Sequence, residues 1–277
     1  MNRLQEYKEI IKEFITVHKE NPVQIMEMAK TDLIKTYRSA AMGWSWAVVK
    51  PGTRLFIYWF AIAIGLRGST MNGEISYFSF LITGLVPWFY MSDLINDGPK
   101  IVRKYGYLVT KLRYPVLTIP TFFSISHLIV HIALMLITGL VLILQGQTPD
   151  IYWLQILFYM LVMVIFFNAW GLLAGMLGAM SLDFVNLVSS FSLALFWLSG
   201  ILFDPDAMEA RHPNIAAILA WNPVTIIVKG YRESFLYKIW FWEKPDEMRN
   251  LLIMFIILVC FAFWSYRRLR KDIADVL

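Results

Sequence analysis

The chain has 277 residues, of which 58% are hydrophobic and 16% are charged, and its formal net charge is +5. A water-soluble domain needs more charged residues on its surface than this chain can supply. The composition therefore excludes an ordinary soluble domain and indicates an integral membrane protein. The ten-residue alternation typical of a membrane barrel is absent from the sequence, and helices pair their backbone groups internally in lipid. We therefore predict an all-α, polytopic membrane protein.

The N-terminal segment, residues 1–50, is expected to stay in the cytosol. Its first twenty residues are rich in Lys and Glu, so no cleavable signal peptide is predicted. Residues 24–42 show the period of an amphipathic helix, which we expect in the headgroup plane with its cationic face toward anionic lipid or lipid-linked phosphate. One face carries Ile25, Ala29, Leu33, Thr36, Tyr37 and Ala40, and the other carries Glu27, Lys30, Thr31, Lys35 and Arg38.

A transmembrane domain is predicted from residue 51 to residue 277. Trp44 and Trp46 precede it and are typical of the membrane interface, and Pro51 fits the first turn of a crossing helix. Six stretches approach or exceed the roughly 20 apolar residues that an α-helix needs to cross about 30 Å of hydrocarbon. The predicted crossings are residues 52–68, 75–96, 118–144, 151–180, 184–203 and 250–266.

The distribution of Lys and Arg predicts the orientation of these crossings. Eight of these residues lie within residues 1–50, five between Asp97 and Tyr114, and four after Tyr266, whereas the loops at 67–74 and 145–150 hold one and none. Because basic loops tend to stay in the cytosol, we expect both termini there, in a multi-pass protein of the plasma membrane. The positive net charge is thus a topological signal and gives little support to nucleic acid binding.

The segment between the fifth and sixth crossings is more apolar than a solvated loop should be. Two short helical pieces, at 213–221 and 223–238, are predicted on either side of a break at Asn222-Pro223. Neither piece is long enough to cross the bilayer. We therefore expect both to be re-entrant, dipping into the outer leaflet or capping the bundle.

Glycines recur in the fourth predicted crossing at intervals of four and three residues, as Gly171, Gly175 and Gly178. Small residues at this spacing let another helix approach closely, so we predict close packing there. No internal repeat is visible in the sequence, and a transporter built from inverted repeats therefore has no support.

Two patterns that suggest chemistry have simpler interpretations. His127 and His131 share a helix face, but zinc needs three or four ligands and no Glu follows His127 as HExxH requires, so hydrogen bonding in the bundle is favoured. Asp204-Pro205-Asp206 resembles the D-x-D pair of glycosyltransferases, yet the charge rule places it outside, away from nucleotide sugars. The sequence has no catalytic triad and no phosphate-binding loop, so we assign no catalytic residue, metal or cofactor to this chain.

Cationic residues close to membrane depth are energetically expensive and are therefore candidates for function. The candidates are Lys50, Arg54, Arg67, Lys229 and Arg232. Each of them could simply extend to the lipid headgroups. The alternative is a set of stations for a phosphate-bearing substrate, since a guanidinium group binds phosphate oxygens two at a time.

Several motifs follow one another along nearly the whole chain. They are YRSAAMGWSWAVVKP (37–51), GLVPWF (84–89), LVTKLRYPVLTIP (108–120), WLSGILF (197–203), NPVTIIVKGYRESFLY (222–237) and the terminal RRLRKDIADVL. In this order they resemble the permease subunits of ABC-2 type polysaccharide exporters. Within this family, four segments look most like the teichoic acid branch of Gram-positive bacteria: IYWFAIAIGLRGSTMNG, DGPKI, YPVLTIPT and ESFLYKIWFW. Two residues differ from those common in relatives of the O-antigen type: Tyr105 stands in place of Asn, and Gly200 in place of Pro. Both differences weaken the resemblance to the O-antigen branch more than the resemblance to the teichoic acid branch.

This resemblance implies a homodimer of the chain with a channel between its two copies. It also implies two copies of a separate ABC ATPase subunit, which binds ATP and Mg in place of this chain. Nucleotide-driven motion is expected to reach the membrane through the loop between the second and third crossings, and the helix at 24–42 is expected to touch the ATPase too. The residues expected to couple the two subunits are Asp97, Lys100, Arg103, Lys104 and Tyr105.

We hypothesise that the chain exports wall teichoic acid linked to undecaprenyl diphosphate, driven by ATP hydrolysis on the partner. The expected substrate entrance is Arg38, Trp44, Trp46, Lys50 and Arg54, the substrate path is Tyr58, Trp59, Trp88, Phe89 and Trp197, and the outer stations are Arg67, Lys229 and Arg232. The alternatives are a permease for lipid-linked O-antigen or capsular polysaccharide, a membrane-bound polyprenyl-phosphate glycosyltransferase, and a structural scaffold.

Overall fold

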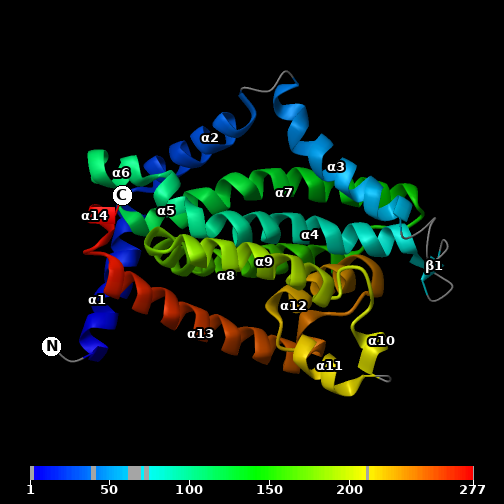
Figure 1. Cartoon of the computed structure of the whole chain (residues 1–277). Helices are drawn as coiled ribbons and strands as arrows, with labels where there is room; N and C mark the ends of the chain where they lie inside the picture. Colours follow the sequence, from blue (N-terminus) through cyan, green and yellow to red (C-terminus); the bar gives the residue numbers. More distant parts are fainter. Residues whose placement is uncertain (1–2, 39–41, 62–69, 72–74, 210–211, 277) are drawn as a thin grey trace.

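The computed structural model describes residues 3–38, 42–61, 70–71, 75–209 and 212–276. Its long helices run side by side between two ends of the molecule (Figure 1). One end, the terminal end, carries both chain termini, and the other, the distal end, carries short helices. Within the described residues the one sheet is a hairpin at the distal end, in which β1 (Thr70–Met71) pairs antiparallel with β2 (Ile75–Ser76).

Four helical segments of the described chain are long and apolar enough to cross a membrane, and they agree with the second, third, fourth and sixth predicted crossings. The segments are Tyr77–Leu112, Val116–Leu144, Ile151–Met180 and Pro245–Leu269. Their regular helices are α4 (Tyr77–Asp97), α7 (Ile119–Leu144), α8 (Gln155–Met180) and α13 (Pro245–Leu269). Helix α4 lies at the centre of the bundle, where every residue from Ser79 to Ser92 is buried.

The first and fifth predicted crossings differ from the helices of the structure. Helix α3 (Trp46–Trp59) begins before residue 52, directly after the turn η1 (Gly43–Ser45), so the prediction that Pro51 lies in the first turn is wrong. Residues 62–68 of this crossing lie outside the described part of the chain. Helix α9 (Leu182–Leu198) ends earlier than predicted because the chain turns at Gly200, whose φ is +66°. The count of six crossings stays a prediction.

The predicted amphipathic helix is α2 (Pro22–Arg38), which packs against α7. Its apolar residues Ile25, Ala29 and Leu33 are buried, whereas Lys30 and Lys35 are exposed. The helix begins and ends earlier than the predicted range 24–42, and residues 39–41 lie outside the described part. The face that the sequence marks as apolar is therefore the face that covers the bundle.

Short helices fill the distal end between α9 and α13 (Figure 1). They are α10 (Asp206–Glu209), α11 (Pro213–Leu219), α12 (Pro223–Arg232) and the π-helical turn η6 (Glu233–Tyr237). The predicted break lies where expected, because the Asn222 carboxamide oxygen accepts a hydrogen bond from the Val224 amide (3.0 Å) and so starts α12. The re-entrant position of these helices stays a prediction.

The connection from α4 to α7 packs against α8 at the terminal end. It consists of η3 (Gly98–Lys100), α5 (Ile101–Lys104), α6 (Gly106–Leu112) and η4 (Val116–Thr118). The predicted close approach at the glycines of α8 is made mainly by this connection, since a Cβ at Gly178 would lie 2.0 Å from the Pro99 carbonyl oxygen. At Gly171 it is made by the long helix α7, because an added Cβ would lie 3.1 Å from the Pro120 side chain. The remaining elements are α1 (Arg3–Glu20), η5 (Ile151–Leu154), η7 (Phe241–Glu243) and α14 (Ile273–Val276).

Replacing Gly178 by alanine is expected to destabilise the protein by about 1–3 kcal/mol, the usual range for overpacking a tight contact. The reason is that backbone atoms of Pro99, which cannot rotate away, occupy the space of the new methyl group. Gly52→Ala in α3 is the matched control, since nothing lies within 4 Å of its added Cβ. Thermal unfolding in detergent measures both variants, and equal midpoints would contradict the prediction.

Candidate functional site

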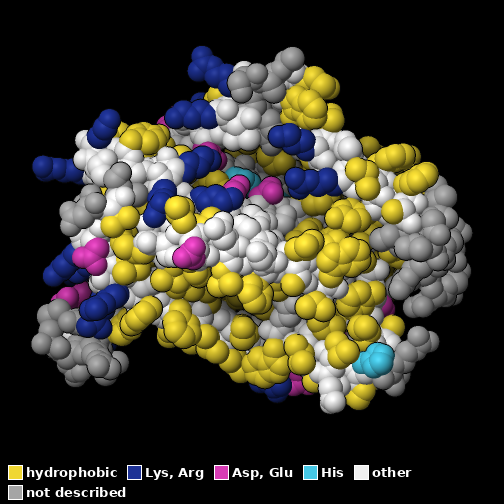
Figure 2. Space-filling view, in the orientation of Figure 1, with side chains coloured by type: hydrophobic (Ala, Val, Ile, Leu, Met, Phe, Trp, Pro, Cys, Tyr) yellow, Lys and Arg dark blue, Asp and Glu magenta, His cyan; other side chains and the backbone are white. Residues whose placement is uncertain are grey.

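A cavity of about 250 Å³ opens beneath the arch that α2 and α3 make over α4 and α7. We call it the charged hollow. Its lining includes the polar residues Thr36, Lys50, Arg54, Asp93, Asp97, His127 and His131 and the aromatic residues Trp46, Phe89 and Tyr90. Figure 2 shows acidic and histidine side chains inside a hollow in this region, with Lys and Arg side chains around it. The hollow therefore combines charge with flat aromatic surface.

Two cations of α3 face this cavity. Lys50 and Arg54 are one helical turn apart and exposed, and the Arg54 guanidinium lies 6.0 Å from the centre of the Phe89 ring. Within the described residues neither side chain forms an ion pair. Trp46 lines the same cavity and is half-buried. Three of the five residues predicted for the substrate entrance thus meet in one place.

The other two entrance residues are placed differently. Arg38 is exposed at the last residue of α2 and does not line the charged hollow. Trp44 lies in the turn η1, and its side chain is outside the described part of the structure. Among the described residues, Lys50 and Arg54 are thus the predicted entrance cations that line the hollow, together with the carboxylates of Asp93 and Asp97.

The two histidines of α7 take part in hydrogen bonds, as the sequence favours. His127 Nδ1 donates to the Phe123 carbonyl (2.9 Å), and His131 Nε2 lies 2.9 Å from the Tyr231 hydroxyl oxygen on α12. The described residues contain no cluster of three or more His, Cys, Asp or Glu side chains that could hold a metal ion. Both imidazole groups thus take part in hydrogen bonds near the hollow.

The aromatic residues predicted for the substrate path gather around Phe196 of α9. The rings of Tyr58 and Trp88 lie 5.1 and 5.6 Å from the Phe196 ring, and Trp197 lies 5.5 Å from it with more than half of its surface exposed. Trp59 packs instead on Phe78, and Phe89 is buried at the wall of the charged hollow. A cluster of aromatic rings, centred on the buried Phe196, thus joins α3, α4 and α9, and its use by a substrate stays a prediction.

Two of the three predicted outer stations, Lys229 and Arg232, make contacts within the protein. Arg67 lies outside the described residues. The Lys229 ammonium pairs with Asp206 (2.6 Å) and with Glu247 (2.5 Å). Arg232 differs most from the expectation, because its side chain is fully buried and its guanidinium donates to carbonyl oxygens of the bundle. In this conformation Arg232 contacts protein and not a passing substrate.

Three of the residues expected to couple to the ATPase form hydrogen bonds with α2 or α8. The Arg103 guanidinium donates twice to the Ala179 carbonyl at the end of α8 (3.0 and 2.7 Å). Lys104 and Tyr105 both contact the carboxylate of Asp32 on α2, with Lys104 Nζ 3.0 Å from it. Lys100 pairs with Asp97 at 3.1 Å. The connection after α4 is therefore joined to the helix that covers the charged hollow.

Asp32 is a residue that our sequence reasoning missed. It is 4% exposed and also accepts a hydrogen bond from the Ser126 hydroxyl (2.6 Å) on α7. Burial alone would raise the pKa of its carboxyl, but the hydrogen bonds from Ser126 and Tyr105 and the charge of Lys104 lower the pKa below its usual range. The sequence does contain a sign of this role. Asp32 lies on the same helical face as the apolar residues Ile25 and Ala29, and a carboxylate buried on such a face needs hydrogen-bonding partners.

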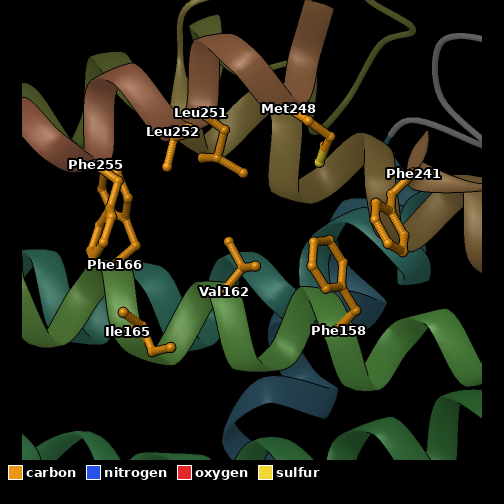
Figure 3. Close-up of a pocket in the computed structure, with 9 residues that line it drawn as sticks. All are labelled: Phe158, Val162, Ile165, Phe166, Phe241, Met248, Leu251, Leu252 and Phe255. Atoms are coloured by element: carbon orange, nitrogen blue, oxygen red, sulfur yellow. The ribbon is translucent and has the colours of Figure 1, made fainter. Parts of the chain in front are cut away.

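A second opening is apolar and lies between α8 and α13 (Figure 3). It has a volume of about 310 Å³, and all the residues that line it are hydrophobic. Figure 3 shows Phe158, Val162 and Phe166 of α8 facing Leu252 and Phe255 of α13. This opening offers no hydrogen-bonding or charged side chain.

The fold and these sites define a helical membrane protein with a charged hollow at one side of its bundle. A profile of the ABC-2 type transporter family matches residues 23–236, and the chain belongs to this family. It is 22% identical over 258 residues to the O-antigen export system permease protein RfbA of Myxococcus xanthus, covering 91% of this chain and 94% of that protein.

Two further relatives have the same level of identity. An O-antigen export system permease protein RfbA of Klebsiella pneumoniae is 22% identical over 254 residues, covering 91% of this chain and 94% of that protein. The polysialic acid transport protein KpsM of Escherichia coli is 22% identical over 237 residues, covering 83% of this chain and 87% of that protein. All three names describe permeases or transporters of polysaccharides.

Proposed function

We propose that this chain is the membrane permease of an ABC exporter that moves a lipid-linked polysaccharide across the plasma membrane. The family match and the names of the relatives support this class of function. The observation that carries the proposal is the charged hollow, in which Lys50 and Arg54 lie beside Trp46 without ion-pair partners among the described residues. Such a site suits a phosphate headgroup followed by sugars.

The contacts of Asp32 suggest how motion of the ATPase is transmitted to the charged hollow. Helix α2 covers the hollow, and Asp32 joins α2 to Lys104 and Tyr105 in the connection that we expect to contact the ATPase. Arg103 joins the same connection to α8. A displacement of this connection would therefore move α2 relative to α7 and change access to Lys50 and Arg54.

The polymer is best described as a lipid-linked polysaccharide without a defined repeat. The relatives are named for O-antigen and polysialic acid, and they favour this broader substrate over wall teichoic acid on undecaprenyl diphosphate. Teichoic acid remains the narrower hypothesis, supported by the sequence motifs alone. We further propose the expected assembly, with two copies of the chain, two ATPase subunits that hold ATP and Mg, and both termini in the cytosol.

Reversing the charges at the entrance tests the proposal. Lys50→Glu combined with Arg54→Glu is expected to lower polymer-stimulated ATP hydrolysis and export at least about fivefold, since each reversal replaces an attraction for phosphate by a repulsion. The measurement uses vesicles that contain the chain, its partner ATPase and a lipid-linked polymer. The matched control is Lys12→Glu combined with Lys19→Glu, which reverses two exposed charges of α1 away from the hollow.

The rival functions give different outcomes in the same system. A glycosyltransferase would transfer sugar as an isolated chain without any ATPase, and a scaffold would tolerate the reversed charges at Lys50 and Arg54. Unchanged export by the double-reversal variant would remove the entrance assignment. Export by the chain without the ATPase would remove the whole proposal.

A further inference from the structure

The charged hollow contains a carboxylate that the proposed function does not use. Asp93 lies on the central helix α4, is partly buried and lines the hollow. Its carboxylate forms no ion pair and no hydrogen bond among the described residues. Because a carboxylate within a membrane bundle is energetically expensive unless it is paired, an unpaired one that faces a cavity is a candidate for contact with a ligand.

The charges that line the hollow restrict what this carboxylate can contact. Lys50 and Arg54 on α3 are cations, and both are close enough to act on the charge of Asp93, as is the His127 imidazole on α7. Asp97, one helical turn along α4, also lines the hollow, but it forms an ion pair (3.1 Å) with a lysine of η3. The hollow therefore presents two unpaired cations and one unpaired carboxylate to a ligand, beside two imidazole groups.

A carboxylate that shares a cavity with two cations has opposite effects on the two parts of a sugar phosphate. It repels phosphate oxygens, and this repulsion increases with the charge of the phosphate. It accepts hydrogen bonds from sugar hydroxyl groups, and a hydrogen bond to a charged acceptor is roughly twice as strong as one between neutral groups. Trp46 lines the same cavity and offers ring surface to the C–H face of a sugar.

A lipid diphosphate differs in these same properties with and without a sugar. In the bare lipid the terminal phosphate carries a charge of about −1.5 to −2 at pH 7, because its second pKa is near 6. Attachment of a sugar turns this phosphate into a diester with a single negative charge and places hydroxyl groups beside it. An unpaired carboxylate in the site therefore favours the sugar-bearing form in two ways, by weaker repulsion and by an added hydrogen bond.

We propose that Asp93 is a specificity-determining residue, which makes the charged hollow favour a phosphate that carries a sugar over a bare phosphate or diphosphate. Its carboxylate accepts a hydrogen bond from a hydroxyl group of the attached sugar, while Lys50 and Arg54 bind the phosphate oxygens. This deepens the proposed function, on which it rests, because an exporter of a lipid-linked polysaccharide has to reject the carrier lipid that holds no polymer.

Binding of two probes that share one lipid chain tests this selection. The probes are farnesyl diphosphate and farnesyl diphospho-N-acetylglucosamine, and the protein is the complex of the chain with its ATPase in nanodiscs. The unmodified complex is expected to bind the sugar-bearing probe about tenfold more tightly than the bare probe. Asp93→Asn is expected to bind the bare probe about tenfold more tightly than the unmodified complex does, because the repulsion is lost. Its affinity for the sugar-bearing probe is expected to change less than about threefold, since the lost repulsion and the weakened hydrogen bond oppose each other.

Two further variants separate the charge of Asp93 from its effect on folding. Asp93→Glu keeps the negative charge and is expected to keep excluding the bare probe. Asp183→Asn makes the same chemical change at an exposed position of α9 outside the hollow, and it is expected to bind both probes as the unmodified complex does. A variant that fails to fold would bind neither probe, so unfolding does not produce the expected gain of binding.

Three results would overturn the inference. They are equal affinity of the unmodified complex for the two probes, an Asp93→Asn variant that alters neither affinity or both equally, and weaker binding of the bare probe to this variant only when magnesium is present. The last result would mean that the carboxylate holds a metal ion. Polymer export by the unmodified complex would leave the proposed function intact in each case, whereas a complex that selects between the probes through Asp93 but exports no polymer would do the reverse.

Discussion

Replacing Asp32 by asparagine is expected to reduce the polymer exported per ATP hydrolysed about tenfold. The carboxylate of Asp32 accepts hydrogen bonds from Lys104 (3.0 Å), from Tyr105 and from Ser126 (2.6 Å). An uncharged carboxamide of the same size loses the ion pair and presents its NH₂ group to donors. Hydrogen bonds to charged groups contribute about 1.5–3 kcal/mol each, and about 1.4 kcal/mol already corresponds to a tenfold change.

The matched control for this variant is Glu27→Gln, which makes the same chemical change at an exposed position of α2. Tyr105→Phe removes one partner of Asp32 and is expected to give a smaller loss, and the double variant with Asp32→Asn is expected to be less than additive. Lys104→Met is expected to have the smallest effect, since the Lys104 side chain is 50% exposed. An Asp32→Asn complex that exports as much polymer per ATP as the unmodified complex would contradict the role given to this contact.

The pH dependence of the contact provides an independent check. The pKa of Asp32 is lowered in the folded protein, so its ionised form contributes stability above the unfolded pKa of about 3.9, and this contribution is lost as the pH falls through the folded pKa. The contact between α2 and α5 should therefore be intact from pH 5 to pH 8. The free energy of local opening of α2, measured by hydrogen exchange of its amides, is therefore expected to be the same at all pH values in this range.

The fold could be predicted largely from runs of apolar residues. The helices α4, α7, α8 and α13 lie where long apolar runs stand in the sequence, because length and hydrophobicity are sufficient to define a crossing. The ends of α3 and α9 were less predictable. They depend on the turn at Gly43–Ser45 and on the chain reversal at Gly200, which are set by local backbone geometry and not by hydrophobicity.

The candidate site was predicted only where its residues are close in sequence. Lys50, Arg54 and Trp46 lie on successive turns of one helix, so their spacing alone brings them to one cavity. Asp32 meets Tyr105 across more than seventy residues, and such a contact depends on how α2 packs on α7. The role of Arg232 was also unpredictable from its neighbours in the sequence. Its partners are carbonyl oxygens about thirty residues away, so in the sequence it looks like an unpaired cation that could bind a substrate.

The partners of Arg232 hold the turn that follows α9. Its guanidinium donates to the carbonyl oxygens of Gly200 and Ile201 (2.6 Å each) and of Phe80 (3.3 Å), and it lies 3.5 Å from the centre of the Phe80 ring. These contacts join α12 to the turn after α9 and to the start of α4. Gly84 leaves the space for them, because a Cβ there would lie 2.4 Å from Arg232 Nη2.

Arg232→Ala is expected to destabilise the protein by about 3–5 kcal/mol, since it leaves three acceptors at buried residues without their donor and opens a cavity. Arg232→Met fills the cavity without donating hydrogen bonds, and we expect it to recover only the packing part of this loss. Arg249→Ala is the control, because Arg249 is exposed and its contacts are an ion pair with Asp246 and a long hydrogen bond (3.4 Å) to Asn250. An exposed ion pair of this kind contributes about 0.5 kcal/mol or less. Thermal unfolding in detergent compares the three variants. Equal midpoints for Arg232→Ala and Arg249→Ala would mean that the turn after α9 is held by other contacts, and Arg232 would then be free to serve as the station that the sequence suggested.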